Sequence, residues 1–80
     1  MSSRFKVLLV GSGAREHALA LRLLESASVS EVVVTPGNPG TRAAPAALAP
    51  KVMRNADGEP ASVARAERPD LVVVGPEGPL

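Results

Sequence analysis

The sequence contains no cysteine, tryptophan or tyrosine, and it has one histidine, His17, and one phenylalanine, Phe5, among its 80 residues. Without cysteine the chain can form neither a disulfide nor a thiolate metal site, and a single histidine cannot make a histidine-based metal cluster. One aromatic ring leaves almost nothing on which nucleic-acid bases could stack. The net charge is only +1, from nine basic and eight acidic residues that are scattered along the chain, so the sequence offers no basic stripe for nucleic acid.

Long hydrophobic runs are absent as well. No apolar run approaches the roughly 20 residues that a membrane-spanning helix needs, and the first run, Val7–Val10, is too short for the hydrophobic region of a signal peptide. We therefore expect a soluble cytoplasmic protein that binds neither membranes nor nucleic acid. The length allows one small domain, residues 1–80, which buries only about 60% of its unfolded surface and is marginally stable without a partner.

The apolar runs that are present have the pattern of buried strands. Val7–Val10 and Leu71–Val74 do not alternate apolar with polar residues, and each run ends at a glycine. Continuous runs of this kind are typical of strands that are buried on both faces of a parallel sheet. The sequence predicts four strands, at Phe5–Val10, Glu31–Thr35, about Lys51–Arg54 and Asp70–Val74.

The segments between these strands predict two helices. Apolar residues recur at helical spacing over Arg15–Ser28, and the residues expected to face inward are Ala20, Leu23, Leu24 and Ala27. A second helix is predicted over Glu59–Glu67, entered through Pro60, with Val63 and Ala66 facing inward. One short helical turn is expected near Thr41–Ala44, and Asn55–Gly58 is interpreted as a turn.

These elements predict an α/β fold, a Rossmann-like parallel sheet with flanking helices. Because crossovers between parallel strands are right-handed, the simplest strand order is 3-2-1-4, one half of a doubly wound fold. Ligands of such sheets bind beyond the carboxyl ends of the strands, where the chain reverses direction across the sheet. The loops predicted to be functional are therefore Gly11–Glu16, Pro36–Thr41 and Gly75–Leu80.

The first of these loops, Gly11–Glu16, runs from a strand into a helix, and its glycines allow close approach to the backbone. The unpaired first amides of the helix favour an anion or a carboxylate. The dinucleotide motif G-x-G-x-x-G fails at Glu16, and no lysine followed by serine or threonine marks a P-loop. A tight turn without a ligand is an equal alternative. The positive charge of Arg15 at the start of a helix is unfavourable unless a nearby anion compensates for it. Glu16 could be only a helix-start residue, and His17 could be a packing residue.

The other two loops each present one candidate polar residue. Prolines and glycines make Pro36–Thr41 a rigid turn that could present Asn38 and backbone amides to a ligand, or that could be purely structural. In Gly75–Leu80, prolines on both sides of Glu77 hold its carboxylate near the predicted switch point. A carboxylate accepts hydrogen bonds from a ribose diol or an amine, so we interpret Glu77 as a binding residue, with a solvated loop glutamate as the alternative.

Three stretches together resemble a known family. The sequences KVLLVGSGAREHAL (6–19), VTPGNPGT (34–41) and PDLVVVGPEGPL (69–80) look like the N-terminal region of the glycinamide ribonucleotide synthetases, also called phosphoribosylamine–glycine ligases. Residues 42–68 match only in the expected order of elements. The family usually has a second consecutive glycine where Ala14 stands, and alanine where Gly78 stands. Both exchanges are small and leave the loops feasible.

The resemblance implies an ATP-grasp ligase of de novo purine (IMP) biosynthesis. Such enzymes join 5-phosphoribosylamine to glycine and cleave ATP to ADP and phosphate. ATP and magnesium would be bound by domains that this chain lacks, so the remainder of the ligase is an implied partner. No residue here is implied to be catalytic or to bind metal, and Glu16 and Glu77 are preferred contacts of the ribose diol. The residues that would shape or contact the substrate side are Gly11, Gly13, Arg15, Glu16, Asn38, Gly75, Glu77 and Pro79.

Because no helix follows the last strand to cover it, we expect a fragment, truncated after the fourth strand and inactive alone. Two alternatives remain. One is a Rossmann-like nucleotide-binding module of another family that binds a pyrophosphate at Gly11–Glu16. The other is a non-catalytic interaction domain that docks and self-associates through the uncovered sheet.

Overall fold

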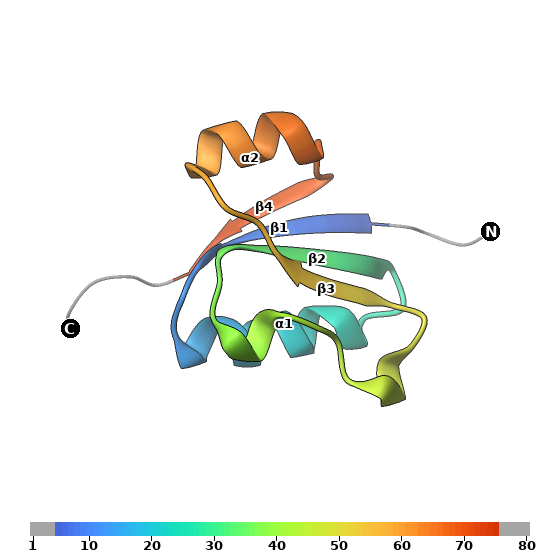
Figure 1. Ribbon diagram of the computed structural model, residues 1–80. Helices are drawn as coiled ribbons and strands as arrows, with labels where there is room; N and C mark the ends of the chain where they lie inside the picture. The colour runs from blue at the N-terminus through green and yellow to red at the C-terminus, as the bar shows by residue number, and fades with distance from the viewer. Residues whose placement is uncertain (1–4, 76–80) are drawn as a thin grey trace.

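The computed structural model describes residues 5–75, in which a four-stranded parallel sheet carries helix α1 on one face and helix α2 on the other (Figure 1). The strand order is β3-β2-β1-β4, and all three neighbouring pairs are parallel. This confirms the predicted fold class and strand order. The elements along the chain are β1 (Phe5–Gly11), α1 (Ala14–Glu25), β2 (Val29–Pro36), the 3-10 turns η1 (Pro39–Thr41) and η2 (Ala46–Leu48), β3 (Val52–Asn55), α2 (Pro60–Glu67) and β4 (Leu71–Val74).

Helix α1 ends three residues earlier than predicted. Ser26 has extended backbone angles (φ −68°, ψ 135°), and its N–H donates to the carbonyl of Leu23, which closes the last turn. The chain then turns directly into β2, whose first residue, Val29, is buried. The prediction that Ala27 faces inward from the helix is therefore wrong, because this residue lies after the helix and is exposed. Of the predicted inward residues, Ala20 and Leu24 are fully buried.

Helix α2 begins at Pro60, one residue after the predicted start at Glu59, and ends at Glu67 as predicted, where the following Arg68 adopts a left-handed conformation (φ 54°). Val63 is buried as predicted. The prediction for Ala66 is wrong, because this residue is exposed and Ala64 packs toward the core instead. The helix is rotated so that Glu67, four residues after Val63, turns toward the sheet and its charged partners.

The segment between β2 and β3 contains two 3-10 turns, η1 and η2, instead of the single turn predicted near Thr41–Ala44. Turn η1 begins earlier than predicted because the Asn38 side chain accepts hydrogen bonds from the N–H groups of Gly40 and Thr41. Asn55, interpreted from sequence as the start of a turn, is the last residue of β3 and pairs with Val34 of β2.

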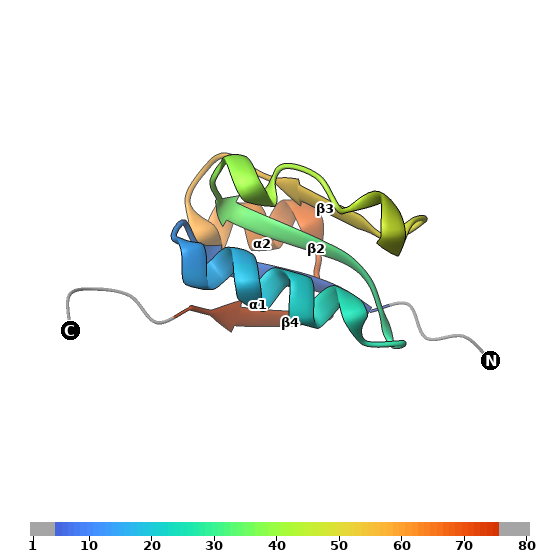
Figure 2. The same ribbon diagram turned by 90° about the horizontal axis from the view of Figure 1, so that it is seen from below.

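The core lies on both faces of the central strands, because side chains alternate between the faces along each strand. Toward α1 lie Val7 and Leu9 of β1 with Val32 and Val34 of β2, and toward α2 lie Leu8 of β1 and Val33 of β2. Figure 2 shows α1 lying along the strands on its side of the sheet. Neither helix within residues 5–75 is long and apolar enough to cross a membrane.

The edge strand β4 is less buried than predicted. Its run Leu71–Val74 was predicted to be buried on both faces, yet Leu71, Val72 and Val74 are 48%, 47% and 68% exposed. The prediction is wrong for the described residues because β4 pairs only with β1, and α1 packs mainly against β1 and β2. Val73 alone packs against the core.

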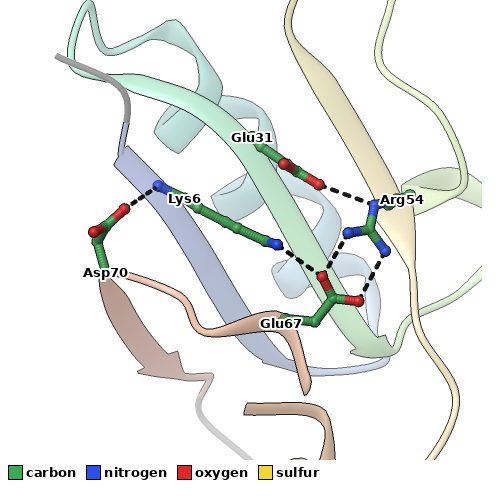
Figure 3. Close-up of polar contacts among 5 residues, drawn as sticks. All are labelled: Lys6, Glu31, Arg54, Glu67 and Asp70. Carbon is green, nitrogen blue, oxygen red and sulfur yellow. Dashed lines mark hydrogen bonds and ion pairs between the residues drawn. The ribbon is translucent and has the colours of Figure 1, made fainter. Parts of the chain in front are cut away.

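A network of charged side chains fixes the end of α2 against the sheet (Figure 3). The carboxylate of Glu67 lies 2.8 Å from Lys6 Nζ of β1 and 2.6 Å from an Arg54 nitrogen of β3, and Arg54 Nε lies 2.9 Å from Glu31 of β2. Hydrogen bonds from Arg54, and secondly from Lys6, lower the pKa of Glu67 to about 2. The network thus ties one end of α2 to three strands.

Candidate functional site

Three loops that are far apart in sequence meet at the carboxyl ends of β2, β1 and β4. Gly11 pairs with Pro36, and the N–H of Gly37 donates to the carbonyl of Gly11 over 3.0 Å. On the other side, the N–H of Gly75 donates to the carbonyl of Val10 over 2.9 Å. The predicted functional loops, as far as they lie within residues 5–75, are therefore neighbours at one edge of the sheet.

Glu16 is the central side chain of this edge. It is the third residue of α1 and only 5% exposed, and its Oε1 accepts a hydrogen bond of 2.7 Å from the N–H of Gly13, the residue before the helix. A carboxyl group in this position caps the helix and is favoured by the helix dipole. Glu16 therefore caps the start of α1, which is one of the interpretations that the sequence allowed for this residue.

The carboxyl group of Glu16 occupies space that two glycines leave free. A Cβ atom at Gly11 would lie 2.1 Å from Glu16 Cγ, and a Cβ atom at Gly75 would lie 2.3 Å from Glu16 Oε2. Both distances are far shorter than a van der Waals contact. Two of the three predicted glycines of the site, Gly11 and Gly75, therefore lie directly against the Glu16 side chain, at the ends of β1 and β4.

The second carboxyl oxygen of Glu16 has a feature that helix capping does not explain. Oε2 is buried, and no hydrogen-bond donor within residues 5–75 reaches it. Buried polar atoms in folded proteins are almost always paired, and leaving one unpaired costs free energy. The atom lies at the carboxyl end of the sheet, next to Gly75. A buried acceptor in this place suits an N–H or O–H group supplied by a ligand.

Asn38 connects two of the loops through its side chain. Its Nδ2 donates to the carbonyls of Ser12 (2.9 Å) and Gly13 (3.0 Å), and its Oδ1 accepts from the N–H groups of Gly40 (2.7 Å) and Thr41 (3.2 Å). These four bonds use the full capacity of a carboxamide. The predicted substrate contact at Asn38 thus falls on a side chain whose hydrogen bonds are already made within the domain.

Arg15 and His17 flank Glu16 on α1. Arg15 is exposed at the second position of the helix, and it forms no ion pair within the part of the chain that the structure describes. An arginine at a helix start, beside unpaired backbone N–H groups, is suited to an anion. The His17 ring packs against η1, where a Cβ atom at Gly40 would lie 2.6 Å from its Nδ1. This agrees with the packing role expected for His17.

Two polar residues at this edge were not singled out from the sequence. Thr41 is fully buried, and its Oγ1 donates to Asn55 Oδ1 over 2.6 Å, while Asn55 Nδ2 donates to the carbonyl of Asn38 over 2.9 Å. The signal for Asn55 was its position directly after the predicted strand Lys51–Arg54, because the carboxyl ends of parallel strands share one edge. The signal for Thr41 was its place at the end of the predicted loop Pro36–Thr41. The predicted site residues Glu77 and Pro79 lie outside the described residues.

A parallel sheet in the order 3-2-1-4, with a glycine turn between β1 and α1 at the point where the strand order reverses, defines a Rossmann-like α/β domain. Sequence comparison identifies the particular family. The profile described as "Phosphoribosylglycinamide synthetase, N domain" matches residues 5–80. The chain belongs to this family, as the three motifs indicated.

Among similar proteins, the phosphoribosylamine–glycine ligase of Xanthomonas campestris pv. campestris is 49% identical over 77 residues. That of Salmonella typhimurium is 48% identical over 80 residues. The trifunctional purine biosynthetic protein adenosine-3 of Bos taurus is 40% identical over 75 residues. Each match covers 94% of this chain but only 17%, 18% and 7% of the respective relative. The chain therefore corresponds to a small part of each relative's length.

Proposed function

We propose that this chain is the N-terminal substrate-binding domain of a phosphoribosylamine–glycine ligase. The complete enzyme would join 5-phosphoribosylamine to glycine and cleave ATP to ADP and phosphate in the biosynthesis of purines. Family membership and the names of the bacterial relatives support the reaction. The observation that carries the location of the site is the buried Oε2 of Glu16, which no donor within residues 5–75 reaches, at the place where the glycine-rich loops meet.

The chemistry of 5-phosphoribosylamine suits the groups at this edge. The molecule has ribose hydroxyls and an amine, which are hydrogen-bond donors, and a phosphate, which is an anion. In the proposed complex, Glu16 Oε2 accepts from a donor of the ribosylamine part, and Glu77 accepts from the ribose diol. Arg15 and the first N–H groups of α1 favour the phosphate. Asn38 holds the loop Gly11–Glu16, which contains Arg15 and Glu16, through its bonds to the carbonyls of Ser12 and Gly13.

The remaining predicted residues have supporting parts in this proposal. Gly11 and Gly75 leave room for the Glu16 side chain, and Gly13 supplies the N–H group that fixes Glu16 Oε1. Pro79 would shape the loop that carries Glu77. None of these residues is proposed to act in chemistry, and ATP and magnesium would be bound by other parts of the enzyme. The proposed place of action is the cytoplasm.

The direct test is an activity assay on the protein encoded by the complete gene. We expect ADP release that depends on both glycine and 5-phosphoribosylamine. Glu77→Ala should raise KM for 5-phosphoribosylamine and leave the KM for ATP unchanged. Arg22→Ala is the matched control, because this side chain is 81% exposed near the far end of α1. Absence of glycine-dependent ADP release contradicts the proposal, and NAD binding in a calorimetric titration would favour a different nucleotide-binding module.

A further inference from the structure

Asn38, Thr41 and Asn55 form a hydrogen-bonded cluster that joins the ends of β2 and β3. Besides its bond to Asn55, Thr41 Oγ1 accepts from the N–H of Asn38 over 2.9 Å. Asn55 Nδ2 closes the cluster at the carbonyl of Asn38. Asn55 therefore bonds to the side chain of Thr41 and to the backbone of Asn38 at once, and it fixes η1 from the side of β3.

The backbone around this cluster is shaped to admit Asn55. Gly37 has a positive φ of 78°, and a Cβ atom there would lie 2.1 Å from Asn55 Oδ1. Glycine adopts this conformation without steric cost, and its missing side chain leaves the space that the Asn55 carboxamide fills. On the opposite side, η1 packs against α1 at His17. The turn is thus held between β3 and α1.

The cluster reaches the glycine loop through the two donor bonds of Asn38. Peptide groups are planar and trans, so a carbonyl and the N–H that follows it point in opposite directions. With the Ser12 carbonyl directed at Asn38, the N–H of Gly13 points away from it, toward Glu16 Oε1. With the Gly13 carbonyl directed at Asn38, the N–H of Ala14 also points away. The Gly13 carbonyl also accepts from the N–H groups of Glu16 (3.1 Å) and His17 (3.2 Å) within α1. Asn38 thus helps to set the directions of both N–H groups at the start of α1, and its bond to the Ser12 carbonyl bears directly on the Gly13 N–H.

We propose that Asn55 is a positioning residue for the ligand site, acting through Asn38 on the peptide groups of Ser12 and Gly13. Asn55 makes no hydrogen bond to the glycine loop itself. It orients the turn whose Asn38 side chain holds the loop, and the loop in turn orients Glu16 and the first N–H groups of α1. This inference rests on the proposed function for the identity of the ligand, but its geometric part is independent of that identity.

Asn55→Ala and Thr41→Val remove the two sides of the same contact, and both are tested in the protein encoded by the complete gene. We expect KM for 5-phosphoribosylamine to rise about tenfold, since a misplacement of about 1 Å can cost up to a hundredfold. The KM for ATP should stay within about twofold, because the cluster lies at the ribosylamine site. Thr41→Ser keeps the hydroxyl group and should restore most of the affinity. Val63→Ala is the stability control, because the Val63 side chain packs with Leu8 and Val33 between α2 and the sheet and takes no part in the hydrogen bonds of the cluster.

Hydrogen exchange provides a measurement that does not depend on activity. The Gly13 N–H should exchange faster in Asn55→Ala than in Val63→Ala when the two are compared at conditions that give them equal stability. The reason is that only Asn55→Ala releases the loop Gly11–Glu16 from the turn that holds it. If Asn55→Ala raises neither KM nor exchange beyond the Val63→Ala control, the positioning role is wrong. If the wild-type protein shows no glycine-dependent ADP release while Gly13 exchange still depends on Asn55, the proposed function is wrong and the positioning role stands.

Discussion

Replacing Glu16 by glutamine separates a binding role from a helix-capping role. The amide oxygen can still accept the 2.7 Å hydrogen bond from the Gly13 N–H, so the cap is retained. The buried carboxyl oxygen that has no donor within residues 5–75 is replaced by a neutral amide group. A buried oxygen without a hydrogen-bond donor lowers stability, so it is not expected in a residue that serves stability alone. In a binding residue, the ligand can supply the donor.

The expected magnitudes follow from this exchange. An unpaired buried group costs about 1–3 kcal/mol, and more when it is charged, so Glu16→Gln should stabilise the unliganded domain by about 1 kcal/mol. For a domain of this size that corresponds to a rise in Tm of about 4–8 °C. A hydrogen bond to a charged group contributes about 1.5–3 kcal/mol, so KM for 5-phosphoribosylamine should rise about 10- to 100-fold.

The assay combines thermal unfolding of the unliganded protein with steady-state kinetics. Glu16→Ala is the comparison variant, because it also removes the acceptor of the Gly13 N–H and should lower stability by about 1 kcal/mol. The reasoning is refuted if Glu16→Gln lowers Tm and leaves KM for 5-phosphoribosylamine unchanged. That result would make Glu16 a helix-start residue and nothing more.

Two further predictions concern the surroundings of the site and the charged network. Gly75→Ala places a Cβ atom 2.3 Å from Glu16 Oε2. It should therefore lower the free energy of unfolding by about 1–3 kcal/mol and raise KM for 5-phosphoribosylamine. Equal urea midpoints for the variant and the wild type would contradict the packing described. The pKa of Glu67 is lowered from 4.5 to about 2, so its contribution is present above pH 4.5 and is lost as pH falls toward 2. Partial exposure of the Glu67 side chain (19%) reduces that contribution to about 1 kcal/mol. The free energy of unfolding of Glu67→Gln should therefore be lower than that of the wild type by this amount at pH 7, and the two should match near pH 2. A difference in stability that does not change with pH would contradict the ion-pair account.

The fold followed from features that are local in sequence. The continuous apolar runs of β1 and β2, separated by one amphipathic helix, predicted a parallel sheet, and right-handed crossovers left one simple strand order. Element ends were less predictable, because hydrogen bonds such as that from Ser26 to Leu23 decide where a helix stops. The composition of Leu71–Val74 alone suggested a strand buried on both faces, but the predicted order 3-2-1-4 already placed this strand at an edge with no following helix, so its exposure agrees with the topology and not with the composition.

The candidate site was predicted loop by loop rather than contact by contact. The glycine turn and Glu16 were identified because a strand, two glycines and a helix start follow one another directly in sequence. Asn55 was missed because its partners, Asn38 and Thr41, lie 17 and 14 positions away and meet it only in the folded sheet. The burial of Glu16 Oε2, which has no donor among the described residues 5–75, likewise depends on the approach of Gly11 and Gly75, which are distant from each other in sequence.

The most direct test of the central claim is a calorimetric titration of glycinamide ribonucleotide, the product of the proposed reaction, into the protein encoded by the complete gene. Wild type and Arg22→Ala are predicted to bind it with equal affinity, and Glu16→Gln to bind at least about tenfold more weakly, for the loss of one charge-assisted hydrogen bond. Binding that is indifferent to Glu16, or no binding by the wild type, would contradict a ribosylamine site at the carboxyl ends of β1, β2 and β4.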